Sequence, residues 1–302
     1  MDFKMRSDLN THEQSIGLLG ISNARELGGY TTTDGHAVKR GVLLRTAGLS
    51  SGSADDFNRL REVYHLAKII DLRSDEEING SEQTAIFTGN MGPDPDPIIE
   101  NAEYIHLPIL DMQKQAAYMN EKFGDKGLPD PTDFIGNLAV MIEHGIIGDQ
   151  LYYWFVDEQI GIKSYRQLFK ELLTLEDGKA LLFHCTQGKD RTGVAAMLIL
   201  SALGIPEEII IDDYLLTNVF NSDRIERERK MLEASGKVSP EKLDTFLMAM
   251  DKVNVSAMTN VITHLKEKYG TIVNYIINEL GITHDEIEQL KNKFLEEKNN
   301  AG

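Results

Sequence analysis

The most constraining feature of this 302-residue chain is the segment 181–193, LLFHCTQGKDRTG, which contains the only cysteine, Cys185. A short apolar run is followed by a glycine-containing turn and an apolar helical pattern, which predicts a strand, a tight loop and a helix. Five residues separate Cys185 from Arg191, so the loop backbone can curl around a tetrahedral oxyanion with the sulfur on one side. The segment therefore predicts a phosphate-binding loop built around a nucleophilic thiolate.

Arg191 is expected to open the helix that follows the loop. Its guanidinium and the unpaired N–H groups of the helix N-terminus can then bind phosphate oxygens together. The same positive helix end, with Arg191 and His184 nearby, is expected to lower the pKa of Cys185 below the usual value of about 8.5. A thiolate at neutral pH follows from this arrangement.

Three other residues of the segment fit the same chemistry. Gly188 and Gly193 allow a close approach of the backbone to a phosphate, and Thr192 is placed to donate a hydrogen bond to the sulfur as it leaves. The alternative is that Cys185 is a buried structural thiol. A nucleotide-binding Walker loop is excluded because it requires a glycine five positions before Gly188, where this chain has Phe183. Sulfur transfer of the rhodanese type remains a competitor.

Residues 184–193, HCTQGKDRTG, resemble the HCxxGKDRTG signature of the bacterial tyrosine and phosphoinositide phosphatase family. Residues 23–30, NARELGGY, are similar to the family's NxRDLGGY element, with Glu26 in place of the usual aspartate. Residues 71–77 resemble its DLRxxxE element, residues 213–218 its DYxxSN segment, and residues 269–270 the YG of its C-terminal helices. The resemblance spans residues 20 to 295, and Gln187 departs from the small residue common in the loop.

The resemblance implies a bacterial cysteine-dependent phosphatase of the protein tyrosine phosphatase superfamily, with dual specificity for phosphotyrosine and phosphoinositides. The expected reaction is hydrolysis of a phosphate monoester through a cysteinyl-phosphate intermediate. The predicted catalytic residues are Cys185, Arg191, Asp190, Asp71, Asp111 and Thr192. The predicted phosphate-binding and substrate-binding residues are Thr186, Gln187, Gly188, Lys189 and Arg191.

Lys189 bears on the choice of substrate. The resembling lipid phosphatases use a lysine at this place to meet the extra phosphates of a polyphosphorylated head group. The alternative is that Lys189 pairs with Asp190 or faces solvent.

Three aspartates compete for the role of the acid that protonates the leaving group. Asp71 ends a strand-like run and would lie at the rim of a parallel sheet, Asp111 follows a second such run, and Asp190 lies inside the loop. The family resemblance favours Asp71 and Asp190, whereas the topology of the wider superfamily favours Asp111. Asp71 ranks first, against the alternative that any one of them makes only local backbone hydrogen bonds.

The formal net charge of -17 limits the classes of molecule that this protein is expected to bind. It disfavours nucleic acid and stable docking on an anionic membrane, because both need positive surface potential. The expected partners are phosphotyrosine proteins or phosphoinositide head groups, without stable membrane insertion. Arg25, Arg45 and Arg73 are candidate auxiliary cations or ordinary scaffold pairs. No His, Cys and Asp spacing matches a metal site, so neither a metal nor another cofactor is expected.

The N-terminal stretch lacks the apolar centre of a signal peptide, and no stretch is long enough to span a bilayer. A cytoplasmic location is expected, although a mature secreted form with an artificial start would have the same sequence. A single cysteine allows no internal disulfide.

Apolar runs at 42–44, 69–70 and 180–183 alternate with helical patterns, which predicts an α/β fold with a mostly parallel central sheet flanked by helices, as in cysteine phosphatases. We expect a flexible segment 1–18 and a single phosphatase domain over 19–297. Within that domain, 112–150 is an insertion that forms a lid or a simple helical appendage, and 205–297 is a helical C-terminal half. Residues 89–98, with three prolines, predict an extended surface loop.

Two functional alternatives stay open at this stage. One is a phosphate-recognition module that binds phosphoproteins or phosphoinositides without turnover. The other is a sulfurtransferase. A pure binding module would not need Cys185, which favours the phosphatase.

Overall fold

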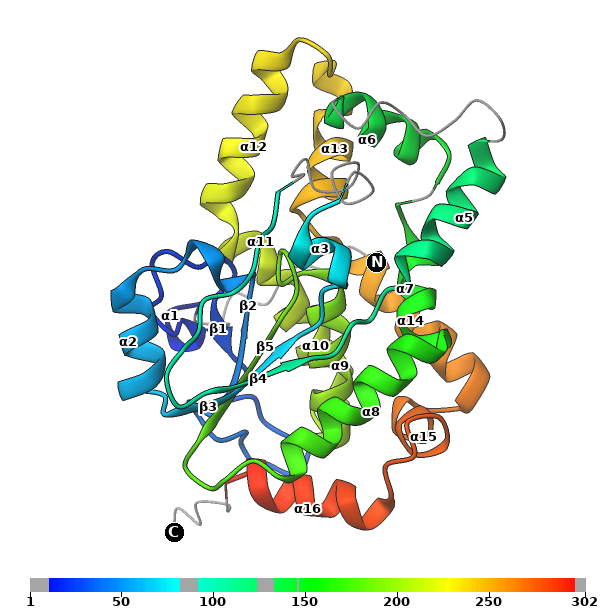
Figure 1. The fold of residues 1–302 in the computed structure, drawn as a ribbon. Coiled ribbons are helices and arrows are strands. Elements are labelled where there is room, and N and C mark those ends of the chain that lie inside the picture. Colours follow the sequence, from blue (N-terminus) through cyan, green and yellow to red (C-terminus); the bar gives the residue numbers. More distant parts are fainter. Residues whose placement is uncertain (1–10, 82–91, 124–132, 146, 297–302) are drawn as a thin grey trace.

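The computed structural model describes residues 11–81, 92–123, 133–145 and 147–296 (Figure 1). At its centre is a five-stranded sheet in the order β1-β2-β5-β3-β4. The strands are β1 (Arg25–Glu26), β2 (Leu43–Thr46), β3 (Leu66–Asp71), β4 (Glu103–His106) and β5 (Ala180–His184). The pairs β2–β5, β5–β3 and β3–β4 are parallel, and the pair β1–β2 is antiparallel. The predicted α/β fold with a mostly parallel sheet is confirmed.

Helices make up the rest of the regular structure. Before β5 they are α1 (Thr11–Gln14), η1 (Leu49–Ser51), α2 (Ala54–Glu62), α3 (Asp75–Asn79), α5 (Met112–Phe123), α6 (Phe134–Glu143), α7 (Asp149–Asp157) and α8 (Gln159–Leu173). After β5 they are α9 (Asp190–Leu203), α10 (Glu207–Leu215), α11 (Thr217–Phe220), α12 (Ser222–Ser235), η3 (Pro240–Lys242), α13 (Leu243–Met250), α14 (Val255–Tyr269), α15 (Ile272–Asn278) and α16 (His284–Phe294). The predicted helical C-terminal half is therefore confirmed over its described residues.

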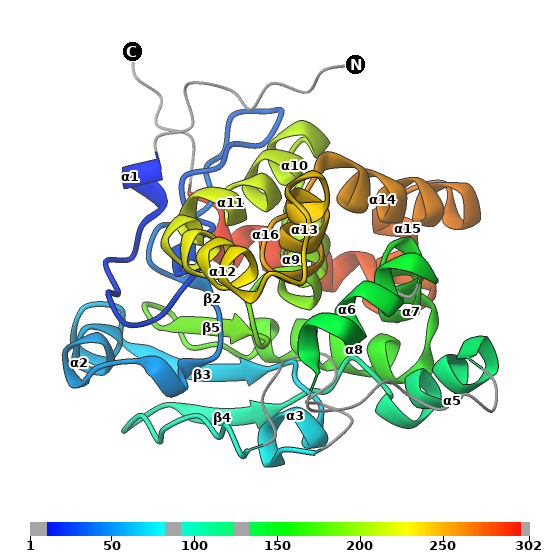
Figure 2. The same cartoon turned by 90° about the horizontal axis from the view of Figure 1, so that it is seen from above.

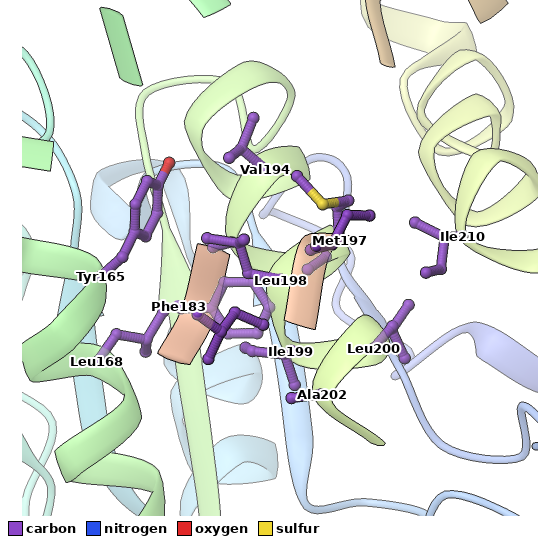
Figure 3. Packing of buried hydrophobic residues seen from close by; sticks show 14 of the residues in the cluster. Tyr165, Leu168, Phe183, Val194, Met197, Leu198, Ile199, Leu200, Ala202 and Ile210 are labelled. Carbon is purple, nitrogen blue, oxygen red and sulfur yellow. The ribbon is translucent and has the colours of Figure 1, made fainter. Parts of the chain in front are cut away.

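Strand β5 is buried on both faces because its side chains alternate between two hydrophobic clusters. Leu181 and Phe183 join the larger cluster, which α8 and α9 cover. Ala180 and Leu182 join a smaller cluster with α2 and the N-terminal segment. Figure 3 shows Phe183 among side chains of α8 and α9, such as Leu168 and Leu198. A continuous apolar strand is expected where helices cover both faces of a parallel sheet.

Helix α9 is apolar around most of its circumference and almost fully buried. It contacts β2 and β5 on one side, and α7, α10, α15 and α16 on the others. A helix of this kind belongs in a core. Its last residue is Leu203, and the next residue, Gly204, caps it in the left-handed conformation (φ 83°) that is common at helix C-termini. Packing on several sides holds the N-terminus of α9 firmly at the end of β5.

A third hydrophobic cluster lies apart from the sheet. It consists of side chains from α5, α6, α12 and α13, together with the segments that join them. We call α6, α12 and α13 the roof. Seen from above, α12 and α13 lie in front of α9, and α6 lies in front of α8 (Figure 2). The predicted insertion 112–150 thus contributes α6 to a structure that it shares with the C-terminal half.

Residues 1–10 of the segment expected to be flexible lie outside the described residues, whereas Thr11–Gln14 forms α1 and Ile16 is fully buried. Of the proline-containing stretch 89–98, only 92–98 is described. It has no regular structure and includes the fully exposed Ile98. Among the described helices, none combines the length and the apolar character that crossing a bilayer requires.

Candidate active site

The loop between β5 and α9 contains residues 185–189, because β5 ends at His184 and α9 begins at Asp190. Gly188 in this loop has φ 64°, and a Cβ atom there would lie 2.3 Å from the carbonyl oxygen of Thr46. A side chain at this position would meet backbone as well as strain its own conformation. The loop therefore requires glycine at 188, as the spacing of the motif indicates.

Buried donors behind the loop bind its carbonyl groups. The side-chain amide of Asn23 donates to the carbonyl oxygens of Gln187 (3.1 Å) and Gly188 (2.8 Å). The guanidinium of Arg45 also donates to the carbonyl oxygen of Gly188 (2.9 Å). In a trans peptide the C=O and the following N–H point in opposite directions. The N–H groups of Gly188 and Lys189 therefore point away from Asn23.

Asp213 binds two fully buried arginines behind this loop. It accepts hydrogen bonds from Arg25 (3.1 Å), Arg45 (2.5 Å) and the hydroxyl of Tyr30 (3.0 Å). Burial alone would raise the pKa of Asp213, but Arg25 and Arg45 hold it below its usual value. The cluster joins residues 23–30 to residues 213–218, two of the segments that carry the family resemblance. Arg25 and Arg45 are thus scaffold pairs, one of the two alternatives expected from sequence.

Cys185 lines a cavity although only 2% of the residue is exposed. Burial opposes the thiolate, but the charge of Arg191, with a smaller contribution from Thr192, lowers the pKa of Cys185 below its usual value. The hydroxyl of Thr192 is buried and makes no hydrogen bond to a described residue. The expected depression of this pKa is present, and its main cause is Arg191.

Glu77 holds the guanidinium of Arg191 on one side. The two groups form a bidentate pair with N–O distances of 2.5 and 2.7 Å. Thr186 donates to the same carboxylate (2.6 Å), and the Ser74 amide (2.9 Å) closes a capping box at the start of α3. Burial opposes ionisation of Glu77, but Arg191 lowers its pKa. Glu77 was absent from the predicted site, although the spacing of residues 71–77 in the family resemblance pointed to it.

Asp71 lies at the end of β3, as predicted, but its carboxylate is fully buried. Arg73 donates to both of its oxygens through the side chain, and Tyr104 donates to one of them at 2.8 Å. Burial opposes ionisation, but the charge of His184 and the bonds from Arg73 hold the pKa of Asp71 well below its usual value. Such a carboxylate gives up no proton near neutral pH. The geometry argues against ranking Asp71 first as the general acid.

His184 is fully buried beside this group. Its Nε2 lies 3.0 Å from Asp96, and its Nδ1 lies 3.9 Å from Asp71. Burial lowers the pKa of the imidazole, but Asp71 and Asp96 outweigh burial and raise it. Potential ligand atoms of Asp71, Asp96 and His184 lie within 4.8 Å of one another. Arg73 already donates to both carboxylates, so a cation occupies the place that a metal ion would need.

Asp111 is exposed, and its carboxylate accepts from the backbone amides of Gln113 (3.0 Å) and Lys114 (3.1 Å) at the start of α5. Its neighbours Leu110 and Met112 line the cavity, whereas Asp111 is not among the described lining residues. This is the local backbone bonding that the sequence left open for any single aspartate.

Asp190 does line the cavity. Its carboxylate accepts a hydrogen bond from Tyr152, whose oxygen lies 2.5 Å from that of Tyr214. Lys189, also in the cavity wall, lies 3.7 Å from the other oxygen of Asp190. The ammonium of Lys189 donates to carbonyl groups at the end of α13, of which that of Met250 is nearest at 3.0 Å. Lys189 therefore connects the loop to the roof.

The cavity measures about 550 Å³ and has a polar floor and a mainly apolar wall, to which α12 also contributes Arg224 and Glu228. The floor is formed by Glu77 and the loop residues Cys185, Thr186, Gln187, Lys189, Asp190 and Arg191. The roof contributes apolar side chains such as Phe134, Leu138, Met231 and Met248. Six of the ten predicted site residues thus meet in one place, whereas Gly188, Thr192, Asp71 and Asp111 are not among the described residues that line the cavity.

A sequence model of the tyrosine phosphatase family matches residues 16–296, which is most of the chain and includes every element of this site. The chain belongs to the tyrosine phosphatase family. It is a phosphatase by that membership, and the resemblance seen in the sequence is confirmed.

Named relatives agree with this assignment. A putative tyrosine-protein phosphatase of Cupriavidus necator is 28% identical over 281 residues, which cover 91% of this phosphatase and 86% of the relative. The triple specificity protein phosphatase PtpB of Mycobacterium tuberculosis is 27% identical over 92% of this chain and 98% of its own. A tyrosine-protein phosphatase of Nostoc commune is 28% identical over 48% of each chain.

Substitution of Gly188 tests the backbone of the loop. Gly178→Ala is the control, because Gly178 has a similar backbone conformation (φ 75°) but open space around it. We expect this substitution to lower the unfolding free energy by about 1 kcal/mol through backbone conformation alone. Gly188→Ala adds contact with the Thr46 carbonyl and should cost at least about 2 kcal/mol. Urea unfolding measures both values. Equal losses would show that the close approach at Gly188 is unimportant.

The pH dependence of Cys185 alkylation tests the thiolate. The rate should reach half its maximum at a lower pH than for an ordinary thiol, because the charge of Arg191 lowers the pKa of Cys185. Thr192→Val removes a buried hydroxyl that favours the thiolate and has no other hydrogen-bond partner among the described residues, so the midpoint should move to higher pH. The rate of iodoacetamide labelling against pH measures both. A midpoint that is unchanged in Thr192→Val would show that the Thr192 hydroxyl does not stabilise the thiolate.

Proposed function

We propose that this phosphatase hydrolyses phosphate monoesters of phosphotyrosine proteins through a cysteinyl-phosphate intermediate. One observation carries the proposal: Cys185, with its lowered pKa, lines the same cavity as Arg191 at the N-terminus of α9. A nucleophile and an anion-binding helix end then face one another.

Binding of the phosphate rests on the loop. The amides of Gly188 and Lys189 point away from the buried donors Asn23 and Arg45, and they supply hydrogen bonds to phosphate oxygens. Arg191 is held by Glu77 on one side. Its Nε–H, together with an Nη–H that makes only a long contact of 3.4 Å to the Leu72 carbonyl or the Thr186 hydroxyl, binds two phosphate oxygens. These donors are in place before the substrate arrives, so they stabilise the charge of the transition state with little rearrangement.

We assign the acid to Asp190, because it is the one of the three candidate aspartates that lines the cavity. In the first step the sulfur of Cys185 attacks phosphorus, the bond from phosphorus to the ester oxygen breaks, and Asp190 gives its proton to that oxygen. In the second step Asp190 takes a proton from water, the water oxygen attacks phosphorus, and the sulfur leaves as a thiolate. Thr192 stabilises the thiolate as it leaves.

The cavity supports an aromatic leaving group. Its apolar wall, formed by the roof, suits the ring of a phosphotyrosine next to the polar floor. We propose that the segment 112–150 acts as a lid through α6, since Phe134 and Leu138 lie in this wall.

Phosphoinositides are the second candidate substrate class, favoured by one observation. Lys189 lies in the cavity wall next to the loop arginine, and it could meet an additional phosphate if it exchanged the α13 carbonyls for that phosphate. The relative from Mycobacterium tuberculosis is named for triple specificity. A panel of phosphotyrosine, phosphoserine and inositides phosphorylated at positions 3, 4 and 5 compares the classes.

Replacement of the nucleophile tests the proposal. We expect Cys185→Ser to lower turnover of an aryl phosphate by at least roughly 10⁴-fold, because the serine hydroxyl is not ionised in this site. Inorganic phosphate should still bind, as calorimetry can measure, since Arg191 and the loop amides remain. Retention of most of the turnover would refute the cysteinyl-phosphate. Binding without turnover by the unsubstituted protein would instead favour a recognition module, and a persulfide on Cys185 after exposure to thiosulfate would favour sulfur transfer.

Leaving groups of different acidity identify the acid. Asp190→Asn should lower kcat on phenyl phosphate by about 10²-fold or more, because phenolate needs a proton to leave. It should lower kcat on p-nitrophenyl phosphate much less. Asp111→Asn is the matched control, and it should change neither rate because Asp111 bonds only local backbone in this structure. The role of general acid would move to Asp111 if kcat fell more on phenyl phosphate than on p-nitrophenyl phosphate in Asp111→Asn and not in Asp190→Asn.

A further inference from the structure

Two buried tyrosines from separate helices meet at the carboxylate of Asp190. Tyr152 comes from α7 and Tyr214 from α10, and at most 6% of either residue is exposed. The hydroxyl of Tyr152 donates to Oδ1 of Asp190, and the hydroxyl of Tyr214 lies 2.5 Å from that of Tyr152. The three groups form a chain of hydrogen bonds that ends at the cavity.

The chain has a direction while Asp190 is ionised. Burial is the main cause that raises the pKa of Tyr152 and of Tyr214 well above their usual value, so each hydroxyl keeps its one proton at neutral pH. An ionised carboxylate accepts hydrogen bonds and donates none. Tyr152 therefore directs its proton to Asp190, and its oxygen accepts the proton of Tyr214.

The two oxygens of Asp190 consequently have different surroundings. Oδ1 is held by Tyr152, whereas Oδ2 lies 3.7 Å from the ammonium of Lys189, another residue of the cavity wall. Oδ2 is thus the oxygen left to carry a proton to and from a reacting group. Both tyrosines keep their own protons while that proton moves.

Close packing against the loop motif holds Tyr214 in this position. A Cβ atom on Gly193 would lie 2.9 Å from Cδ2 of the Tyr214 ring. Gly193 ends the segment that begins with the nucleophile, and it leaves the space that this ring fills. The ring could not approach the first turn of α9 so closely if residue 193 had a side chain.

We propose that Tyr152 and Tyr214 are positioning residues for Asp190, which orient its carboxyl group so that Oδ2 exchanges the proton with the leaving group and with water. The inference rests on the proposed role of Asp190 as acid and goes beyond it by naming the groups that orient it. The tyrosines touch neither the phosphate nor the sulfur in this scheme.

Replacement by phenylalanine removes each hydroxyl and keeps the ring. Tyr152→Phe should lower kcat on phenyl phosphate roughly 10-fold, as expected for loss of a hydrogen bond to a charged group, and change kcat on p-nitrophenyl phosphate little. Tyr214→Phe should give the same changes at smaller size, since it acts through Tyr152.

Tyr275→Phe is the matched control. Tyr275 is fully buried, and its hydroxyl donates to the carbonyl oxygen of Val156, on the same helix as Tyr152 but away from Asp190. It should leave the ratio of the two rates unchanged, even where thermal unfolding shows lost stability. An effect of Tyr275→Phe equal to that of Tyr152→Phe would mean that both act through the placement of α7.

A double substitution separates failure of this inference from failure of the proposed function. In the Asp190→Asn background, Tyr152→Phe should have no further effect on the ratio of the two rates. A further loss there, or an equal loss on both substrates in Tyr152→Phe alone, would overturn the positioning role while Asp190 stays the acid. If Asp190→Asn itself shows no dependence on the leaving group, the assignment of the acid is wrong, and the inference falls with it. Tyr214→Phe gives the same answer if Tyr152→Phe does not fold.

Discussion

The site depends on a buried ion triad in which Asp213 binds both Arg25 and Arg45. Two cations against one anion leave excess positive charge beneath the phosphate loop, and burial together with repulsion from Arg25 lowers the pKa of Arg45 to about 10. Buried ions are costly unless each is paired and hydrogen-bonded. Here one Nη–H of Arg45 and the side-chain amide of Asn23 bind loop carbonyls, so charged and polar groups of the buried cluster also shape the loop, while Nε of Arg45 has no hydrogen-bond partner among the described residues.

Local cations reconcile a strongly acidic protein with an anionic substrate. The chain carries a formal net charge of -17, yet the floor of the cavity contains Arg191 and Lys189 above the excess charge of the triad. Glu77 neutralises part of this field and also orients Arg191. Fields at short range inside a cavity are screened less by salt than those on an open surface. Binding of a phosphate is therefore decided by these few groups and not by net charge.

The sequence predicted features that depend on neighbours along the chain. The strand, loop and helix of 181–193 and the requirement for glycine at 188 follow from local spacing, and the structure has them. Asp71 shows the limit: the rule for strand ends placed it at the rim of the sheet, where the structure pairs it with His184 in the register of β3 and β5. It could not show that Tyr104 and Arg73 occupy its carboxylate. Contacts such as Arg191 with Glu77, or Asp190 with Tyr152, join residues far apart in sequence, and no periodic pattern encodes them.

The roof has its own hydrophobic cluster, separate from the two that cover the sheet. Regions with separate cores open with different free energies, and a smaller cluster opens more readily than a large one. The wall over Cys185 can therefore loosen while the sheet that carries this cysteine stays folded. Under the proposed mechanism, access of a bulky phosphoester to the sulfur depends on the local stability of the roof, which selection can adjust without changing the residues proposed to react.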